Sequence, residues 1–281
     1  MRNPVFSRSA DFKANPSQHY GFGSPSAGYA SVASVGAGQL NAMYAQPAAG
    51  PLETGRVTYD DILIKSAGMF GLLLVGATVG WLVAPRPGGV GIIFGCAIAG
   101  FVLALVNIFK RRVSRLLVIA YSLIEGVFVG GISRIFEAYS PGVVVQAVIA
   151  SLCVFGATLA LFASGKVRAS GRMTKIVCVA LVGYLIFCLV NLVLMWTGVL
   201  GDRPFGLRSV PVFGVPLGVV LGIVVVFMAA YCLVVDFDAI KTAVGNGAPA
   251  DVAWTCAFGL VVDMVFLYLE VLRLLAIFNR N

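Results

Sequence analysis

Two aspartates in long apolar stretches are the residues of this chain best suited to chemistry. Asp263 stands inside the apolar run 257–278, and Asp236 closes the preceding run. A carboxylate in hydrocarbon is costly unless it is paired, protonated or facing water, so it marks a candidate functional site. Two carboxylates that meet in a low dielectric cannot both ionise cheaply and would share a proton. We therefore expect a proton-controlled latch, whose ionised form offers the oxygen ligands that suit Ca²⁺. The plainer alternative makes Asp236 an interfacial residue and Asp263 a paired structural acid.

The last apolar run carries further charges on the face of Asp263. In a helix over 252–278, Asp263 lies roughly 15 Å along the axis and Glu270 about 10 Å further. At 100° per residue the two acids are about 20° apart around the axis, and Arg273 lies about 60° from Glu270. We expect one polar stripe that faces a cavity or other polar groups inside a bundle.

The third apolar run holds polar residues at matching depths. Glu125 lies about 14 Å from the start of that run, level with Asp263. It is a candidate third member of the central polar site, and a satisfied structural glutamate is the equal alternative. Arg134 and Glu137 lie near the other end of the run and match the depth of Arg273. Glu125, Glu270 and Arg273 are therefore the candidates for a polar pore.

The composition predicts that these residues sit in an all-α integral membrane protein. Of the 281 residues, 59% are hydrophobic and 11% are charged, whereas soluble domains carry about 25% charged residues. Residues 1–57 are rich in Gly, Ala, Ser, Pro, Gln and Tyr, and we expect a disordered cytoplasmic tail there. Residues 58–281 then form a seven-helix transmembrane domain. The runs long enough to cross about 30 Å of hydrocarbon are 62–84, 89–109, 114–133, 142–164, 174–197, 213–236 and 252–278.

Short-range signals refine this plan. Thr58, followed by Asp60 and Asp61, is typical of a helix N-cap, and the four-residue spacing of Gly126 and Gly130 indicates close helix packing. The link between the last two runs is short, so their helices should be antiparallel neighbours. That places the two aspartates at similar depth, and the match improves if the sixth helix continues past Asp236.

The distribution of basic residues indicates orientation. The formal net charge of +8 comes from residues clustered between apolar runs, which favours a topological role over nucleic-acid binding. The richer set of links holds Lys110, Arg111, Arg112, Arg115, Lys166, Arg168, Arg172, Lys175 and Lys241. The opposite links hold Arg86, Arg134, Arg203 and Arg208. The positive-inside rule predicts a multi-pass protein of the cell (inner or plasma) membrane, with its N-terminus in the cytoplasm and its C-terminus outside.

Metal chemistry based on histidine or cysteine is not expected. His19 is the single histidine, and the six cysteines lie in or beside apolar runs without C-x-x-C spacing. They are typical of small buried hydrophobes. We expect no cofactor, with Ca²⁺ at Asp236 and Asp263 as the one candidate metal.

The pattern around these acids resembles the Bax inhibitor-1 (TMBIM, YccA-like) family. Its last helix is similar to Ala257-Phe-Gly-Leu-Val-Val-Asp263 with Leu267-Tyr-Leu and Leu272-Arg273-Leu-Leu, and its sixth-helix motif is similar to Val235-Asp236 with Ile240. The small-residue motif Glu125-Gly-Val-Phe-Val-Gly130-Gly also fits, and the tail beginning Met1-Arg-Asn-Pro-Val-Phe resembles the bacterial branch.

The resemblance implies a fold in which six helices surround the last one. It also implies a pH-sensitive Ca²⁺ leak gated on the cytoplasmic side by two aspartates, which by position are Asp236 and Asp263. Arg273 matches an arginine near the outer end. The chain departs from the family pattern at Val235, where a tyrosine is common, and at Glu270, where the family usually has an apolar or aromatic residue.

Four functions compete at this point. A proton-gated cation leak and an ion-coupled transporter would both use the buried acids. An intramembrane aspartyl protease would need two aspartates on adjacent helices, but the surrounding motifs differ from that class, and we expect no enzyme. A regulator of membrane-protein quality control would bind a membrane protein partner and would not need the acids. In every case the lipid bilayer is the environment, and cations and protons are the expected small partners.

Overall fold

A computed structural model describes residues 55–110, 114–199, 205–212 and 214–279. These residues belong to one compact unit, residues 50–281. Most of the predicted tail, up to residue 54, lies outside the described residues. Its last part pairs with the link before the final helix, since Val57 N donates to the Ala248 carbonyl at 2.8 Å.

The described chain is built almost entirely from helices. Six of them, α2 to α7, are long and apolar enough to cross a membrane, which confirms a helical multi-pass membrane protein. A short 3₁₀ helix, η2 (Gly206–Ser209), and a hairpin of β1 (Pro211–Val212) and β2 (Val215–Pro216) precede α7. The long helices are α2 (Tyr59–Val83), α3 (Gly89–Phe109), α4 (Arg115–Tyr139), α5 (Val143–Ala163), α6 (Gly171–Trp196), α7 (Leu217–Gly245) and α8 (Val252–Phe278).

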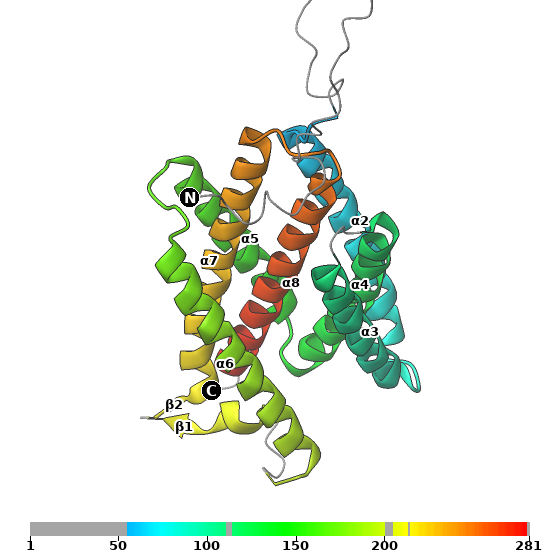
Figure 1. The fold of residues 1–281 in the computed structure, drawn as a ribbon. Coiled ribbons are helices and arrows are strands. Elements are labelled where there is room, and N and C mark those ends of the chain that lie inside the picture. Colours follow the sequence, from blue (N-terminus) through cyan, green and yellow to red (C-terminus); the bar gives the residue numbers. More distant parts are fainter. Residues whose placement is uncertain (1–54, 111–113, 200–204, 213, 280–281) are drawn as a thin grey trace, which may run out of the picture. The chain divides into compact units, whose positions relative to one another are not determined.

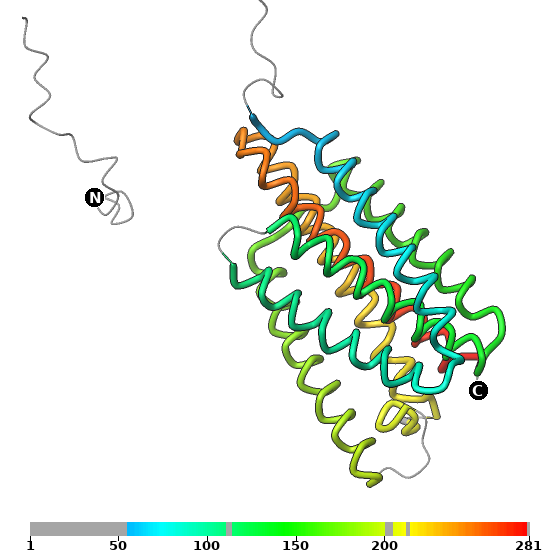
Figure 2. The backbone as a smooth tube through the Cα atoms, turned by 90° about the vertical axis from the view of Figure 1, so that its right-hand side faces the viewer, coloured from blue at the N-terminus to red at the C-terminus, as the bar shows by residue number. Residues whose placement is uncertain are grey.

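Helix α8 has neighbours on both sides. It packs against α2, α4, α5 and α7, while α3 packs mainly on α4. Figure 1 shows α8 between α7 and the α2–α4 group, and Figure 2 shows these helices running alongside one another. Two buried clusters flank it: one includes Leu233 of α7 and Leu267 of α8, and the other includes Met69 of α2 and Val261 of α8. That α8 is itself a seventh span surrounded by all six others stays a prediction.

Helices α2 and α4 meet backbone against backbone. A Cβ atom added at Gly126 would collide with the Leu73 carbonyl of α2, and one added at Gly130 would collide with the backbone of Ala77. Gly76 and Gly80 of α2 have the same relation to α4. The close packing predicted from Gly126 and Gly130 is therefore confirmed, because only glycine lets the two axes approach this closely.

The ends of the helices follow local chemistry. The Thr58 hydroxyl accepts a hydrogen bond from Asp61 N at 3.1 Å, which confirms the predicted N-cap of α2. Helix α7 starts later than predicted because Pro211 and Pro216 lie in the short hairpin. It also ends later, at Gly245 rather than at Asp236. Polar residues end the hydropathy signal at Asp236, but no glycine or proline lies between Asp236 and Gly245.

Candidate functional site

The two aspartates come together because α7 continues past Asp236. Asp236 lies roughly 14 Å inside the C-terminal end of α7, and Asp263 roughly 17 Å inside the N-terminal end of α8, from their positions in these helices. Residues 246–251 join the two helices, so the two depths agree within about one helical turn. Both side chains are half-buried. The depth match expected for a longer sixth helix is therefore present.

The carboxyl groups of Asp236 and Asp263 lie close enough to share a hydrogen bond. An ionised carboxylate has only acceptor oxygens, so such a bond requires a proton on one of the two groups. Asp236 Oδ2 is buried, and no conventional donor reaches it in the described part of the chain. The pair can therefore hold one proton as a bond between helices and loses that bond when both groups ionise.

Gly259 of α8 makes room for this pair. A Cβ atom at residue 259 would lie 3.2 Å from Asp236 Oδ2 and 3.3 Å from its Oδ1. Gly259 precedes Asp263 by one helical turn, so Asp236 rests on bare backbone beside its partner. Sequence reasoning quoted this glycine within a motif but gave it no role. Its spacing of four residues from an intramembrane acid was the available signal.

Glu125 lies near the pair without joining it. Its buried carboxyl packs against Gly100 of α3, where an added Cβ atom would lie 3.5 Å from the Glu125 Cδ. Tyr121, one turn earlier on α4, stacks edge-on against Phe258 of α8 with ring centroids 5.1 Å apart. The Tyr121 hydroxyl lies within electrostatic range of both Glu125 and Asp263. Tyr121 thus lies between Glu125 and Asp263, and no direct bond between Glu125 and the pair occurs among the described residues.

The polar stripe of α8 divides into two separate clusters. Glu270 and Arg273 form an ion pair, and Arg208 Nη1 lies 3.9 Å from Glu270 Oε2. Tyr184 of α6 accepts hydrogen bonds from Arg208 at 2.5 Å and from Arg273 at 3.3 Å. This ion cluster is made of Arg208, Glu270, Arg273 and Tyr184, and its two α8 members lie about two to three turns beyond Asp263. Glu270 and Arg273 are therefore bonded within it rather than at the aspartates.

Arg208 is the member of the ion cluster that its place in the sequence does not reveal. It lies in the link between two apolar runs, yet it is only 6% exposed. Asn191 of α6 accepts a hydrogen bond from Leu207 N at 2.7 Å and holds η2 against the bundle, so Arg208 points inward. Its guanidinium also lies 5.3 Å from the Tyr184 ring centroid. Arg134 and Glu137, which match the depth of Arg273, make their contacts outside the ion cluster, with Trp81 and with Gly142 N.

The carboxylates offer few ligands for a resident metal ion. No group of three or more His, Cys, Asp or Glu side chains that could hold a metal occurs within the described ranges. The aspartate pair supplies at most four oxygens, whereas Ca²⁺ takes about six to eight. Water or backbone carbonyls would have to complete the shell, which suits an ion in passage better than one held permanently.

Comparison with known proteins identifies the family of the chain. No curated protein matches the chain. A family model described as Bax inhibitor 1 like matches residues 3–280, which is nearly the whole sequence. The chain therefore belongs to the Bax inhibitor 1 like family.

Proposed function

We propose that this protein is a pH-sensitive leak channel for cations, with Ca²⁺ as the favoured ion and Asp236 and Asp263 as its gate. The observation that carries the proposal is the close approach of two carboxyl groups on neighbouring helices of an apolar bundle, with the Asp236 carboxyl lying against Gly259 one turn from Asp263. Two amide side chains could form an interhelical hydrogen bond of the same kind if the pair were only structural. Two acids add a response to proton concentration.

The gate follows from the charge of the pair. With one proton bound, the hydrogen bond ties α7 to α8 and leaves a single negative charge. When pH rises and the proton leaves, two unit charges about 4 Å apart repel by roughly 4 kcal/mol at an effective dielectric constant of 20. That repulsion acts to separate α7 from α8, and the doubled negative charge attracts a divalent cation. Flux should therefore rise with pH.

The proposal takes α8 as a seventh membrane span. Its 27 residues are long enough, and its charges are accommodated because Asp263 and Glu270 have partners inside the bundle. The basic links then place the N-terminus and the gate on the cytoplasmic side of a cell membrane. The proposal assigns no enzymatic activity and no resident cofactor.

Ca²⁺ flux into liposomes that contain the purified protein tests the proposal across about pH 5 to 8. Wild type should show flux that rises with pH. Asp236→Asn and Asp263→Asn should each flatten that rise, because an amide pairs with the remaining acid without titrating. Asp238→Asn is the matched control, since Asp238 lies on the same helix outside the pair, and it should behave as wild type.

Other results would contradict the channel. Absence of flux at every pH, with both variants matching wild type, would leave a regulator of membrane-protein quality control as the better function. Saturable uptake coupled to a proton gradient would favour an ion-coupled transporter. An equal pH response in Asp238→Asn, Asp263→Asn and wild type would remove the aspartate pair from the gate.

A further inference from the structure

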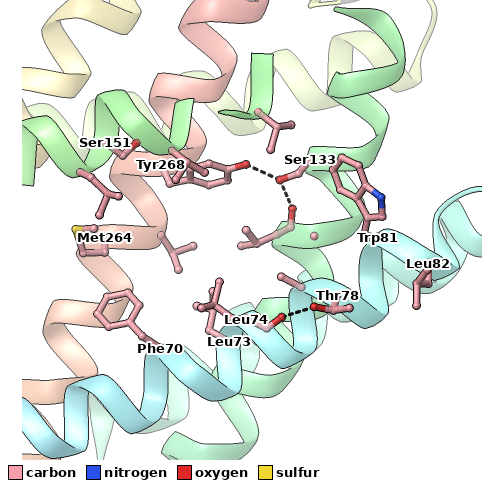
Figure 3. Close-up of a pocket in the computed structure, with 17 residues that line it drawn as sticks. Phe70, Leu73, Leu74, Thr78, Trp81, Leu82, Ser133, Ser151, Met264 and Tyr268 are labelled. Carbon is pink, nitrogen blue, oxygen red and sulfur yellow. Dashed lines mark hydrogen bonds between the residues drawn. The ribbon is translucent and has the colours of Figure 1, made fainter. Parts of the chain in front are cut away.

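A cavity of about 520 Å³ lies away from the aspartate pair, among α2, α4, α5 and α8 (Figure 3). Its size is within the usual range for small-molecule pockets, roughly 300–1,000 Å³. Leu74, Leu82 and Leu152 line it and are also more than half exposed. The cavity therefore opens on the outer surface of a bundle whose surrounding solvent is lipid.

The extent of the cavity matches one leaflet of a bilayer. On α2 its lining runs from Phe70 to Leu82, which is roughly 18 Å along the helix axis. Half of the hydrocarbon core measures about 15 Å. Because α2 ends at Val83, the cavity runs from the middle of the bilayer to the membrane surface. A single acyl chain has this length and orientation.

The walls of the cavity suit hydrocarbon. The Ser133 hydroxyl is bonded to the Tyr268 hydroxyl at 2.7 Å, and the Thr78 hydroxyl donates to the Leu74 carbonyl at 2.9 Å (Figure 3). Ser151 Oγ is the one lining hydroxyl within the described ranges that has no partner. An occupant therefore meets mostly apolar side chains and few free donors.

An unpaired positive charge lies at the surface end. Arg134 of α4 places its Cζ 5.2 Å from the ring centroid of Trp81, which lines the cavity. Glu137 is the acid one turn away on α4, but its carboxylate accepts hydrogen bonds from Gly142 N at 2.6 Å and Val144 N at 3.1 Å. No acid within the described ranges pairs with Arg134, so its guanidinium is available for an anion. Arginine binds phosphate well, and tryptophan favours the membrane interface.

We propose that this cavity holds one acyl chain of an anionic glycerophospholipid, with the lipid phosphate bound by Arg134 beside Trp81. The apolar length accounts for the chain, and the unpaired guanidinium accounts for the charge of the headgroup. This site is independent of the proposed channel, because its contacts do not include Asp236 or Asp263.

Fluorescence quenching in liposomes tests the site. The chain has three tryptophans, and Trp196→Phe with Trp254→Phe leaves Trp81 as the reporter. Phosphatidylglycerol and phosphatidylcholine with the same brominated chains are compared as quenchers. Phosphatidylglycerol should quench Trp81 at lower mole fraction. Arg134→Ala should lower this preference about fivefold, the contribution of one basic side chain near an anionic surface. Arg86→Ala, an exposed arginine just beyond α2, is the control and should keep the preference.

A second pair of variants tests the acyl chain. Val148→Phe fills the cavity, whereas Val145→Phe adds the same bulk to an exposed position of α5 outside the lining. Val148→Phe should reduce quenching by both lipids, and Val145→Phe should not. Equal effects of Arg134→Ala and Arg86→Ala would overturn the phosphate site. Equal effects of the two valine variants would overturn the acyl site.

Discussion

Removing the charge of Glu270 should destabilise the protein more than any other single change of charge in its helices. Glu270 is 4% exposed and, among the residues that the structure describes, is the single acid that contacts both arginines of the ion cluster. Glu270→Gln keeps the shape of the side chain and leaves two guanidinium groups facing an amide. The change therefore isolates charge from packing.

The magnitude follows from the burial of the two arginines. The Arg208 side chain is 7% exposed and the Arg273 side chain 31% exposed. Breaking a buried ion pair by removing one partner costs about 3–5 kcal/mol, because the other charge stays buried. Arg273 can turn partly toward solvent, so the lower end applies, and we expect a loss of about 3 kcal/mol.

Equilibrium unfolding in mixed detergent micelles measures this loss. Asp251→Asn is the control, because the Arg115 and Asp251 side chains of its ion pair are 67% and 70% exposed. Such exposed pairs contribute about 0–1 kcal/mol. Adding Arg208→Met to Glu270→Gln should recover most of the loss, since the double variant no longer buries that unpaired charge. A Glu270→Gln protein as stable as the Asp251→Asn protein, or a double variant less stable than Glu270→Gln, would refute the reasoning.

Three further predictions concern close approaches and a cap. Gly259→Ala should displace the Asp236 carboxyl, weaken its bond to Asp263 and move the midpoint of pH-dependent flux to lower pH. The control Gly183→Ala, with open space around it, should leave that midpoint unchanged. A shift of the Gly259→Ala midpoint to higher pH would contradict the prediction. Gly130→Ala should lower the free energy of unfolding by about 1–3 kcal/mol through overpacking against α2. The control Gly156→Ala, whose added Cβ atom would have no neighbour within 4 Å, should not lower it. Equal stabilities of the two variants would contradict the backbone contact. Thr58→Ala should lower the free energy of unfolding by about 1 kcal/mol through loss of the α2 cap. The same unfolding assay measures this against the control Thr197→Ala. An unchanged stability would show that Asp61 N finds another acceptor.

Much of the fold could be predicted because hydropathy marks each membrane helix directly. The apolar runs before α6 correspond to real helices within three residues, except that α4 ends at Tyr139 rather than at residue 133, and 252–278 matches α8 at both ends. The end of α7 was harder, because hydropathy falls at Asp236 while the backbone hydrogen bonds of a helix continue without regard to side-chain polarity. Only a helix breaker would have ended it there, and the first glycine or proline after Asp236 is Gly245.

The candidate site was predictable in part for a similar reason. Asp236 and Asp263 stand out because charge in hydrocarbon is rare, and the helical period correctly placed Glu270 near Arg273. The partner that completes the ion cluster could not be found this way. Arg208 lies between apolar runs, and its burial depends on how η2 folds back against Asn191, a tertiary contact that no local pattern reveals.

The glycine contact between α2 and α4 has a mechanical consequence. Side chains that interdigitate can change rotamer and let two helices slide, but facing backbones have no such freedom. Any displacement of α4 must therefore carry α2 with it as a single rigid lever. Helix α8 packs against α2 and α4 with one face and against α7 with another, so a movement that separated α7 from α8 would leave α2, α4 and α8 together as one unit.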